Sequence, residues 1–350
     1  MPEDISQLQV FIQQLPKVEL HLHLEGSVRP ETLRELARSK RRNPQAVEDW
    51  IAARTSSGFR YGNFRGFIEA FTAVTLLLET PADYALATGR LVEWLADQNV
   101  RYAEVTLSAG VVLGKKQPLE AVFEAVVQAA AEAEARAPLR GKPRVRLQWI
   151  LDAVRQFGAD HARDVLRYAS RYRPMGVVAF GIGGDEARGP AELFPDVYRE
   201  ALDQGLHVTA HAGESCGPES IRQAVELLGA ERIGHGLTAA QDPSVLALLR
   251  ERQVPVEVCL SSNVSTGVLS SLEEHPLRKF LDNHLVVTLN SDDPAMFGTS
   301  LTQEFLLAAE KFSLARSQLV RFMENAARAA FLSEGDKQRL LDEIFRASKG

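Results

Sequence analysis

The sequence lacks the features that mark several classes of protein. Its only two cysteines, Cys216 and Cys259, form no Cys-x-x-Cys pair, which argues against a disulfide framework. No apolar run approaches the roughly 18 residues of a membrane-spanning helix. No long basic run accompanies the formal net charge of −6 at pH 7, so we expect neither a membrane nor a nucleic acid as a partner.

Three local signals are also missing. The first residues, 1–4, lack the positively charged and apolar regions of a signal peptide, which together with the points above predicts a cytoplasmic protein. No Gly-x-Gly-x-x-Gly follows the first predicted strand, which argues against a dinucleotide-binding sheet. The glycine-rich segment 181–184 is not followed by the lysine of a phosphate-binding loop.

What the sequence does contain is a regular alternation of strand and helix patterns over most of its 350 residues. Strands that alternate with helices are parallel and are joined by right-handed crossovers. Eight of them predict an α/β fold, the closed (β/α)₈ barrel of TIM type, with an open doubly wound sheet as the alternative. The predicted strands are residues 18–25, 101–107, 145–151, 177–182, 206–211, 232–235, 254–258 and 285–290.

The remaining segments fit around this barrel. Residues 1–14 are predicted as a leading helix, and residues 301–350 as closing helices. A helical insertion follows the first strand, over residues 30–97, and we expect it to gate the pocket. Its aromatics either line the pocket or pack within the insertion: Phe59, Tyr61, Phe64 and Phe67. With no linker and no internal repeat, residues 1–350 are expected to form a single domain.

The first strand carries a candidate metal motif. His21 and His23 are two residues apart, so they point to one face, about 6–7 Å apart along the strand. A lone His-x-His is more often a half-exposed strand than a metal site. However, the C-terminal ends of barrel strands form the active-site face, and other polar residues occupy such ends here. They are His211 and Glu214 after the fifth strand, His235 after the sixth, and Asp292 and Asp293 after the eighth.

Three histidines and a carboxylate suit Zn²⁺. We assign His21, His23, His211 and Asp292 as the metal ligands. Glu214 and His235 are then the candidate acid and base, and Asp293 is the candidate residue that orients the substrate. Taken singly, Asp292-Asp293 before Pro294 could cap a turn, and His235 could be an ordinary loop histidine. Their convergence on one barrel mouth favours the site. No lysine lies between Lys142 and Lys279 to bridge two metals, so we expect one ion.

At these residues the sequence resembles the adenosine deaminase family of the amidohydrolase superfamily, over about residues 15–331. The matching motifs are Pro-Lys-Val-Glu-Leu-His-Leu-His-Leu-Glu-Gly, His-Ala-Gly-Glu, Arg-Ile-Gly-His-Gly and Ser-Asp-Asp-Pro. The resemblance implies hydrolytic removal of the purine 6-amino group by a zinc-activated water. It also implies that His235 takes the proton of the water, that a protonated Glu214 donates to N1, that Asp293 bonds N7 and that the Gly184 N–H bonds N3. No organic cofactor is implied.

The resemblance leaves the substrate open within the family. Adenosine deaminases usually carry aspartate at the position of Glu25, which resembles a residue that contacts the 5′ end of ribose. Adenine deaminases and deaminases of 6-amino-6-deoxyfutalosine carry glutamate there. Residues 262–267 and 298–302 resemble the nucleoside enzymes, whereas residues 291–294 resemble adenine deaminases. We favour adenosine or a 5′-modified adenosine, and a carboxylate at Glu25 disfavours a 5′-phosphate.

Two other classes remain as alternatives. One is a mononuclear metal hydrolase for a different substrate such as a phosphoester, although no basic cluster lies beside the motifs. The other is a binding protein that kept the fold and lost activity, although every candidate catalytic residue is present. The sequence carries no signal for an oligomeric state.

Overall fold

Eight parallel strands form one sheet whose order follows the sequence, from β1 to β8, in the computed structural model, which describes residues 5–349. The strands are β1 (Lys17–His23), β2 (Val100–Leu107), β3 (Arg146–Val154), β4 (Val177–Gly183), β5 (His207–Ala212), β6 (Arg232–His235), β7 (Val256–Val258) and β8 (Val287–Leu289). A parallel bridge between Leu22 and Asp292 joins the end of β8 to β1. The predicted (β/α)₈ barrel is therefore confirmed.

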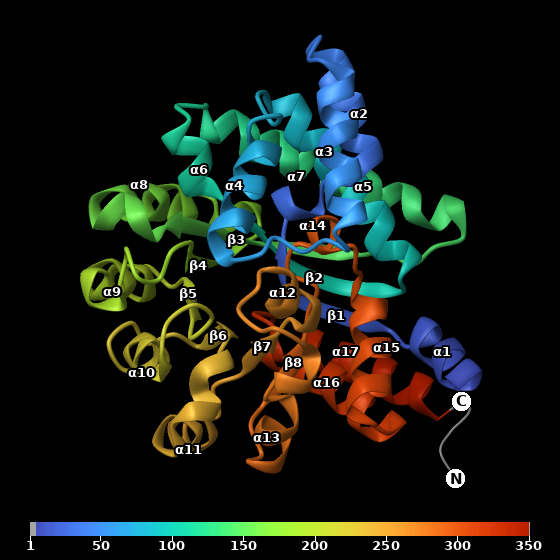
Figure 1. Cartoon of the computed structure of the whole chain (residues 1–350), viewed down its shortest axis with the longest axis vertical. Coiled ribbons are helices and arrows are strands. Elements are labelled where there is room, and N and C mark those ends of the chain that lie inside the picture. Colours follow the sequence, from blue (N-terminus) through green and yellow to red (C-terminus); the bar gives the residue numbers. More distant parts are fainter. Residues whose placement is uncertain (1–4, 350) are drawn as a thin grey trace.

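Helices surround the strands on the outside (Figure 1). Before β3 they are α1 (Ile5–Gln14), α2 (Pro30–Ser39), α3 (Pro44–Ser56), α4 (Phe64–Thr75), α5 (Pro81–Asp97), α6 (Ala109–Gly114) and α7 (Leu119–Arg136). After β3 they are α8 (Gly158–Arg171), α9 (Pro195–Asp203), α10 (Pro218–Glu226), α11 (Pro243–Glu251), α12 (Leu260–Ser265), α13 (Leu277–Asp282), α14 (Pro294–Phe297), α15 (Leu301–Phe312), α16 (Arg316–Ala329) and α17 (Glu334–Ser348). No helix among residues 5–349 is both long and apolar enough to cross a membrane.

Both faces of the first strand are buried. Val18, Leu20 and Leu22 join the hydrophobic core, and the alternating polar residues of β1 are buried as well. A strand enclosed on both sides is the normal state of a parallel barrel. The alternation in this stretch therefore separates a helix-facing side from a barrel interior, and not a core from solvent.

The boundaries differ from prediction where polar residues enter the barrel. The prediction ends the third strand at residue 151, before Asp152, but β3 continues to Val154. A barrel interior holds polar side chains near its active-site end, so Asp152 does not break the strand. The short helices α6 and α12, which follow β2 and β7, were not predicted. The leading helix is present as α1, and residues 1–4 of that prediction lie outside the described residues.

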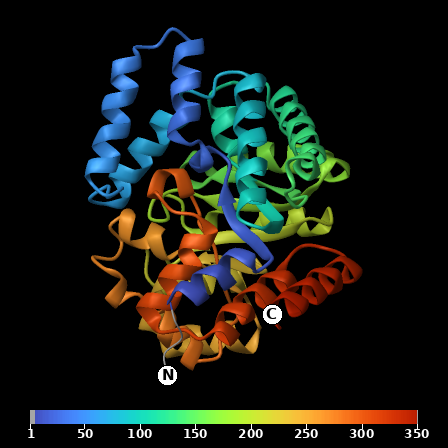
Figure 2. The same cartoon turned by 90° about the vertical axis from the view of Figure 1, so that its right-hand side faces the viewer.

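The predicted insertion is helical and rises above one end of the barrel, where α2, α3 and α4 project together (Figure 2). The start of α5 is fixed by side-chain hydrogen bonds. The Thr80 hydroxyl accepts from the Asp83 N–H, and the Asp83 carboxylate accepts from the Thr80 N–H at 2.7 Å, which is a capping box ahead of Pro81. This fixes the place where the insertion returns to the barrel wall.

Candidate active site

The four predicted metal ligands come together at the mouth of the barrel. His21 and His23 lie on β1, His211 lies on β5, and Asp292 follows β8. One ligand atom from each lies within 4.8 Å of all the others. The Nε2 atoms of His23 and His211 are 3.3 Å apart, and Asp292 Oδ1 lies 3.3 Å from Nε2 of both His21 and His23.

These distances fit a tetrahedral metal ion. Bonds of 2.0–2.1 Å place neighbouring ligand atoms about 3.3–3.4 Å apart. The second ring nitrogens are already engaged: His21 Nδ1 lies 2.9 Å from the Glu257 carboxylate, and His211 Nδ1 donates to the Ile182 carbonyl at 3.2 Å. In the neutral rings of His21 and His211, Nε2 therefore presents a lone pair to the centre. His21 Nε2 is buried without a hydrogen-bond partner, as expected of an atom that binds a metal.

The electrostatics of the cluster also favour a cation. Burial lowers the pKa of His23 to about 4 and lowers that of His211, so both rings are neutral. Burial opposes a charge on His21 too, but its contacts with the Asp292 and Glu257 carboxylates raise its pKa to about 10. A site that draws a proton onto a buried imidazole would stabilise a metal ion in the same place.

A second set of donor atoms, on His235, Cys259 and Asp292, shares Asp292 with the first. Burial raises the pKa of the Cys259 thiol well above its ordinary value, which disfavours the thiolate that metals bind. We therefore treat the three histidines and Asp292 as the metal-ligating set.

The predicted acid and base lie beside these ligands. His235 Nε2 is 3.7 Å from Glu214 Oε2 and 3.9 Å from Asp292 Oδ2. Glu214 is held by Glu186, whose carboxylate accepts from the N–H groups of Gly213, Glu214 and Ser215 at 2.8–2.9 Å. Burial, together with Asp292 nearby, raises the pKa of Glu214 well above its usual range, which favours the protonated carboxyl.

A chain of hydrogen bonds fixes the tautomer of His235. The Leu277 N–H donates to His275 Nδ1 at 3.1 Å, so neutral His275 carries its proton on Nε2. That N–H donates to Asn263 Oδ1 at 3.2 Å, which turns the Asn263 amide nitrogen toward His235 Nδ1, 3.3 Å away. Since Nδ1 of His235 accepts, its neutral ring carries the proton on Nε2, facing Glu214 and Asp292.

The predicted substrate-binding residues occupy the same mouth. Asp293 is buried, and its Oδ1 has no hydrogen-bond partner. Only glycine fits at Gly26, where a Cβ would lie 1.7 Å from that oxygen. Glu25 is buried just after the end of β1, and its carboxylate accepts a hydrogen bond from the Ser108 N–H at 3.1 Å. Burial raises the pKa of Glu25 to about 7. Gly184 has φ +98° and lines the cavity.

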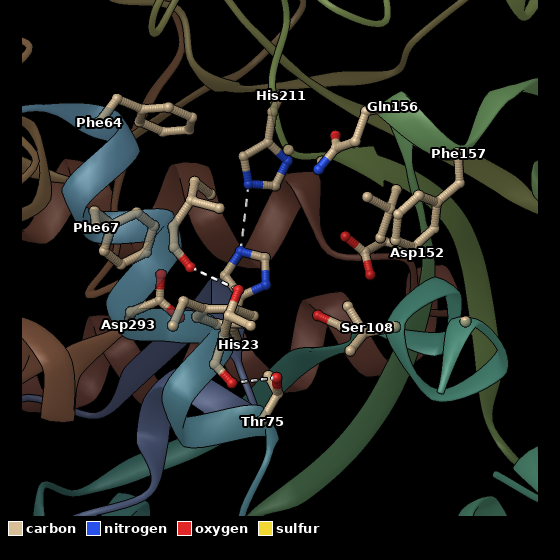
Figure 3. A pocket seen from close by; sticks show the side chains of 18 of the residues that line it. His23, Phe64, Phe67, Thr75, Ser108, Asp152, Gln156, Phe157, His211 and Asp293 are labelled. Carbon is tan, nitrogen blue, oxygen red and sulfur yellow. Dashed lines mark hydrogen bonds between the residues drawn. The ribbon is translucent and has the colours of Figure 1, made fainter. Parts of the chain in front are cut away.

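A cavity of about 320 Å³, within the range of small-molecule sites, is lined by Gly184, Glu214, His235, Asp293 and the metal-ligating residues other than His21. Glu25 is not among its lining residues. Figure 3 shows Phe64 and Phe67, from α4, on one side of His23 and His211, with Asp152, Gln156 and Phe157 on the other. Of the insertion aromatics considered above, Phe64 and Phe67 line the cavity. Tyr61 instead packs on Phe67 and donates to the Met296 carbonyl at 2.7 Å. The insertion thus forms part of the cavity wall, and its gating of the cavity stays a prediction.

Sequence reasoning missed four buried polar residues that touch the site or its ligands: Asp152, Glu186, Glu257 and Asn263. One signal was available for Glu257, which stands between Val256 and Val258 in an apolar strand where an unpaired charge would be costly. It binds the buried Arg232 at 2.6 Å, and Arg232 in turn binds Glu104 at 2.6 Å. The contacts of Glu186, in a turn, and of Asn263, on the short helix α12, depend on tertiary packing that leaves no periodic pattern in the sequence.

Comparison with known proteins agrees with this geometry. A family described as adenosine deaminase matches residues 16–347. The aminodeoxyfutalosine deaminase of Streptomyces avermitilis is 38% identical over 96% of this chain and 92% of its own length. The adenosine deaminase of Serratia proteamaculans is 34% identical over 94% of this chain and 98% of its own.

Among solved structures, an amidohydrolase of Burkholderia ambifaria with bound zinc has a TM-score of 0.87 and 25% identity, covering 99% of this chain and 95% of that one. The match to the family extends over nearly all of the chain, and the fold and the cluster of histidines are consistent with it. The chain belongs to the adenosine deaminase family and is a hydrolytic deaminase of adenine-type substrates.

Proposed function

We propose that this enzyme hydrolyses the 6-amino group from the purine of a nucleoside, either adenosine or an adenosine modified at its 5′ carbon such as 6-amino-6-deoxyfutalosine. The observation that carries this proposal is the meeting of Glu214, His235 and Asp293 around the three histidines and Asp292 in one buried cavity. We further propose that one Zn²⁺ occupies the ligand cluster. Its nitrogen and oxygen donors, their tetrahedral spacing and the zinc-bound structural relative support that choice.

When bound, the metal acts as a Lewis acid that activates a water molecule near neutral pH. The residues of the chain handle the protons. Glu214, protonated because it is buried, donates to purine N1 as C6 becomes tetrahedral. The two hydrogens of the water end on N1 of the product and on the ammonia that leaves, so Glu214 is restored to its protonated form in each cycle.

Two further contacts orient the purine. N7 is an acceptor, so its partner must carry a proton, and burial beside Asp292 raises the pKa of Asp293 well above its usual range. Asp293 can then donate from its free oxygen to N7. The Gly184 N–H is the proposed donor to N3, and Gly184 lines the same cavity.

His235 receives a role that differs from the one implied by resemblance. The resemblance gives it the proton of the water, but the chain through Asn263 makes neutral His235 a donor at Nε2. We propose that this N–H binds the attacking oxygen and that the second carboxylate oxygen of Asp292, 3.9 Å away, accepts the proton. This division of roles can be tested separately from the reaction itself.

Several features support a nucleoside over the free base. Besides the purine-binding groups, the cavity is lined by apolar side chains that include Phe71, Leu76, Val111 and Phe157. Apolar lining of this kind suits a 5′ extension that carries little charge. Glu25, buried at the end of β1, opposes a 5′-phosphate. The alternative, an adenine deaminase, rests on the resemblance of residues 291–294 to that branch.

The test is ammonia release by the zinc-loaded protein from adenosine, 6-amino-6-deoxyfutalosine, adenine and AMP in parallel. Release from a nucleoside and not from adenine or AMP is the expected result. Release from adenine alone would assign the enzyme to the free-base branch. No release from any of the four, with zinc bound, would refute the proposed purine chemistry. Glu214→Gln is the matched control, since it should bind zinc and release no ammonia above background.

A further inference from the structure

Three buried polar atoms at the site have no hydrogen-bond partner among the described residues: His21 Nε2, Asp293 Oδ1 and Asp152 Oδ1. The proposed function supplies partners for the first two, namely the metal and purine N7. It supplies none for Asp152. Since buried polar groups in native proteins are almost always satisfied, an orphaned carboxyl oxygen that lines a substrate cavity points to a contact with the ligand.

The strand register places Asp152 level with Ser108, whose N–H binds Glu25, the residue expected to contact the 5′ end of the ribose. Leu107 on β2 pairs with Leu151 on β3, so Ser108 comes level with Asp152. Ser108 also donates its N–H to Glu25 at the end of β1. Glu25, Ser108 and Asp152 therefore stand at the ends of three neighbouring strands. Asp152 is only 5% exposed, and what remains exposed opens into the cavity.

Two glycines on β4 make room for this carboxyl group. Gly181 is the register partner of Asp152, and a Cβ there would lie 3.5 Å from the Asp152 Cβ. A Cβ on Gly183 would lie 3.0 Å from Asp152 Oδ2. The next residue, Gly184, is the proposed donor to purine N3. Asp152 is thus held next to the N3 side of the base, and Figure 3 shows it on the opposite side of His23 from Asp293.

The chemistry of a nucleoside identifies what would meet Asp152 there. Purine N3 is separated from N9 by one carbon, C4, and N9 carries the sugar. In the anti conformation, N3 lies on the same side of the glycosidic bond as the 2′-hydroxyl. A group beside N3 that both lacks a partner and can accept a hydrogen bond is therefore placed to bind that hydroxyl.

We propose that Asp152 binds the ribose 2′-hydroxyl of the substrate and so makes the enzyme selective for ribonucleosides. This inference rests on the proposed function, because the position of the purine in the cavity is taken from that proposal. It adds a specificity residue that acts on the sugar and takes no part in the proton transfers at C6. Free adenine and 2′-deoxynucleosides would leave Asp152 buried and unpaired, which is how a polar site rejects an analogue that lacks a hydroxyl.

The test compares kcat/KM for adenosine, 2′-deoxyadenosine and 3′-deoxyadenosine in the wild type, Asp152→Asn and Asp152→Ala. We expect the wild type to prefer adenosine over 2′-deoxyadenosine by about tenfold to a hundredfold. In Asp152→Ala this preference should fall to within about twofold, through loss of activity on adenosine. Asp152→Asn, which still offers an acceptor, should retain part of it. The preference over 3′-deoxyadenosine should be the same in all three proteins.

An unchanged 2′ preference in Asp152→Ala would overturn the proposal, as would a change confined to the 3′ position. A binding measurement separates this outcome from failure of the proposed function. Calorimetric titration of the zinc-loaded proteins with inosine and 2′-deoxyinosine needs no turnover, and the affinity difference between the two should disappear in Asp152→Ala. Zinc content and thermal midpoint of each variant confirm that the fold and metal site are intact. Ammonia release from none of the substrates would instead refute the reaction.

Discussion

His23 and Asp292 are joined through both backbone and side chain. The N–H of His23 donates to the carbonyl of Asp292 at 2.9 Å, and the Asp292 Oδ1 lies 3.3 Å from His23 Nε2. The N–H of Asp292 also donates to the carbonyl of His21 at 3.1 Å. The backbone hydrogen bonds that close the barrel between β8 and β1 therefore involve three of the metal ligands, His21, His23 and Asp292. Metal binding and barrel closure thus depend on the same residues.

We expect zinc to stabilise the fold through this closure between β8 and β1. At free zinc about a thousandfold above its Kd the stabilisation is about 4 kcal/mol. At roughly 2–4 °C for each kcal/mol, the thermal midpoint of the metal-free protein should rise by roughly 10 °C when zinc is added. Differential scanning calorimetry at fixed protein concentration measures the shift.

The variant Asp292→Asn tests the origin of this shift. Asp292 has φ +62°, which asparagine tolerates well, so the substitution removes charge and leaves the backbone in place. The zinc-induced rise should become much smaller in Asp292→Asn and remain complete in Glu214→Gln. A full rise in Asp292→Asn would mean that the metal binds elsewhere.

Gly26→Ala should misplace Asp293. The added Cβ would lie 1.7 Å from Asp293 Oδ1, so the carboxyl group must move away from the purine. We expect kcat/KM to fall by at least about tenfold, as when one well-placed polar contact is lost, while zinc content stays the same. Steady-state kinetics with metal analysis measures both.

The matched control for that variant is Gly89→Ala. Gly89 lies within α5, and a Cβ there meets nothing within 4 Å. This substitution should leave kinetics unchanged and stabilise the helix by roughly 0.5–1 kcal/mol. Activity in Gly26→Ala equal to that of Gly89→Ala would show that Asp293 does not contact the substrate.

The fold and the metal-ligating set could be predicted from the sequence because both follow simple geometric rules. Alternating strand and helix patterns imply a parallel barrel, and a barrel brings every strand end to one mouth. His21, His211 and Asp292 are 190 and 81 residues apart along the chain, yet their places at strand ends suffice to bring them together. The prediction needed no knowledge of side-chain packing.

The supporting residues could not be predicted in that way. Asn263 acts on His235 only because α12 carries it over the end of β6, and α12 was not predicted. Asp152 lies one residue beyond the predicted third strand, although β3 continues to Val154. The roles of Asn263 and Asp152 depend on neighbours that are distant in sequence. Only the folded barrel shows which buried polar groups have hydrogen-bond partners and which have none.

The tautomer of His235 gives a third prediction. Asn263 links His275 to His235 through hydrogen bonds, and its amide N–H is the group that donates to His235 Nδ1. Replacing Asn263 by aspartate removes this donor. Carboxylate oxygens only accept, so the proton of neutral His235 should move to Nδ1 and leave a lone pair at Nε2. Nitrogen-15 spectra of histidine-labelled protein distinguish the two tautomers and should show this change.

The kinetics of the same variant separate the two roles of His235. If Nε2–H binds the attacking oxygen, Asn263→Asp should lower kcat by at least about tenfold and more than Asn263→Ala does, because Asn263→Ala still allows the Nε2–H form. If His235 instead takes the proton of the water, Asn263→Asp should be the more active of the two. Higher activity in Asn263→Asp than in Asn263→Ala would refute the donor role of His235. It would support the role implied by resemblance, in which His235 takes the proton of the water.

Stability of the metal-free protein should depend on pH through His275. Burial lowers the pKa of His275 to about 3, against about 6.5 in the unfolded chain. Between these values the unfolded state binds more protons than the folded state, so the free energy of unfolding falls as pH falls from about 6.5 to 3. His275→Gln removes this contribution while leaving a group that can donate to Asn263. Thermal midpoints measured from pH 7 to pH 4 should therefore fall less steeply in His275→Gln than in the wild type. Parallel curves for the two proteins would show that His275 takes up a proton in the folded state, which would break the chain that sets His235.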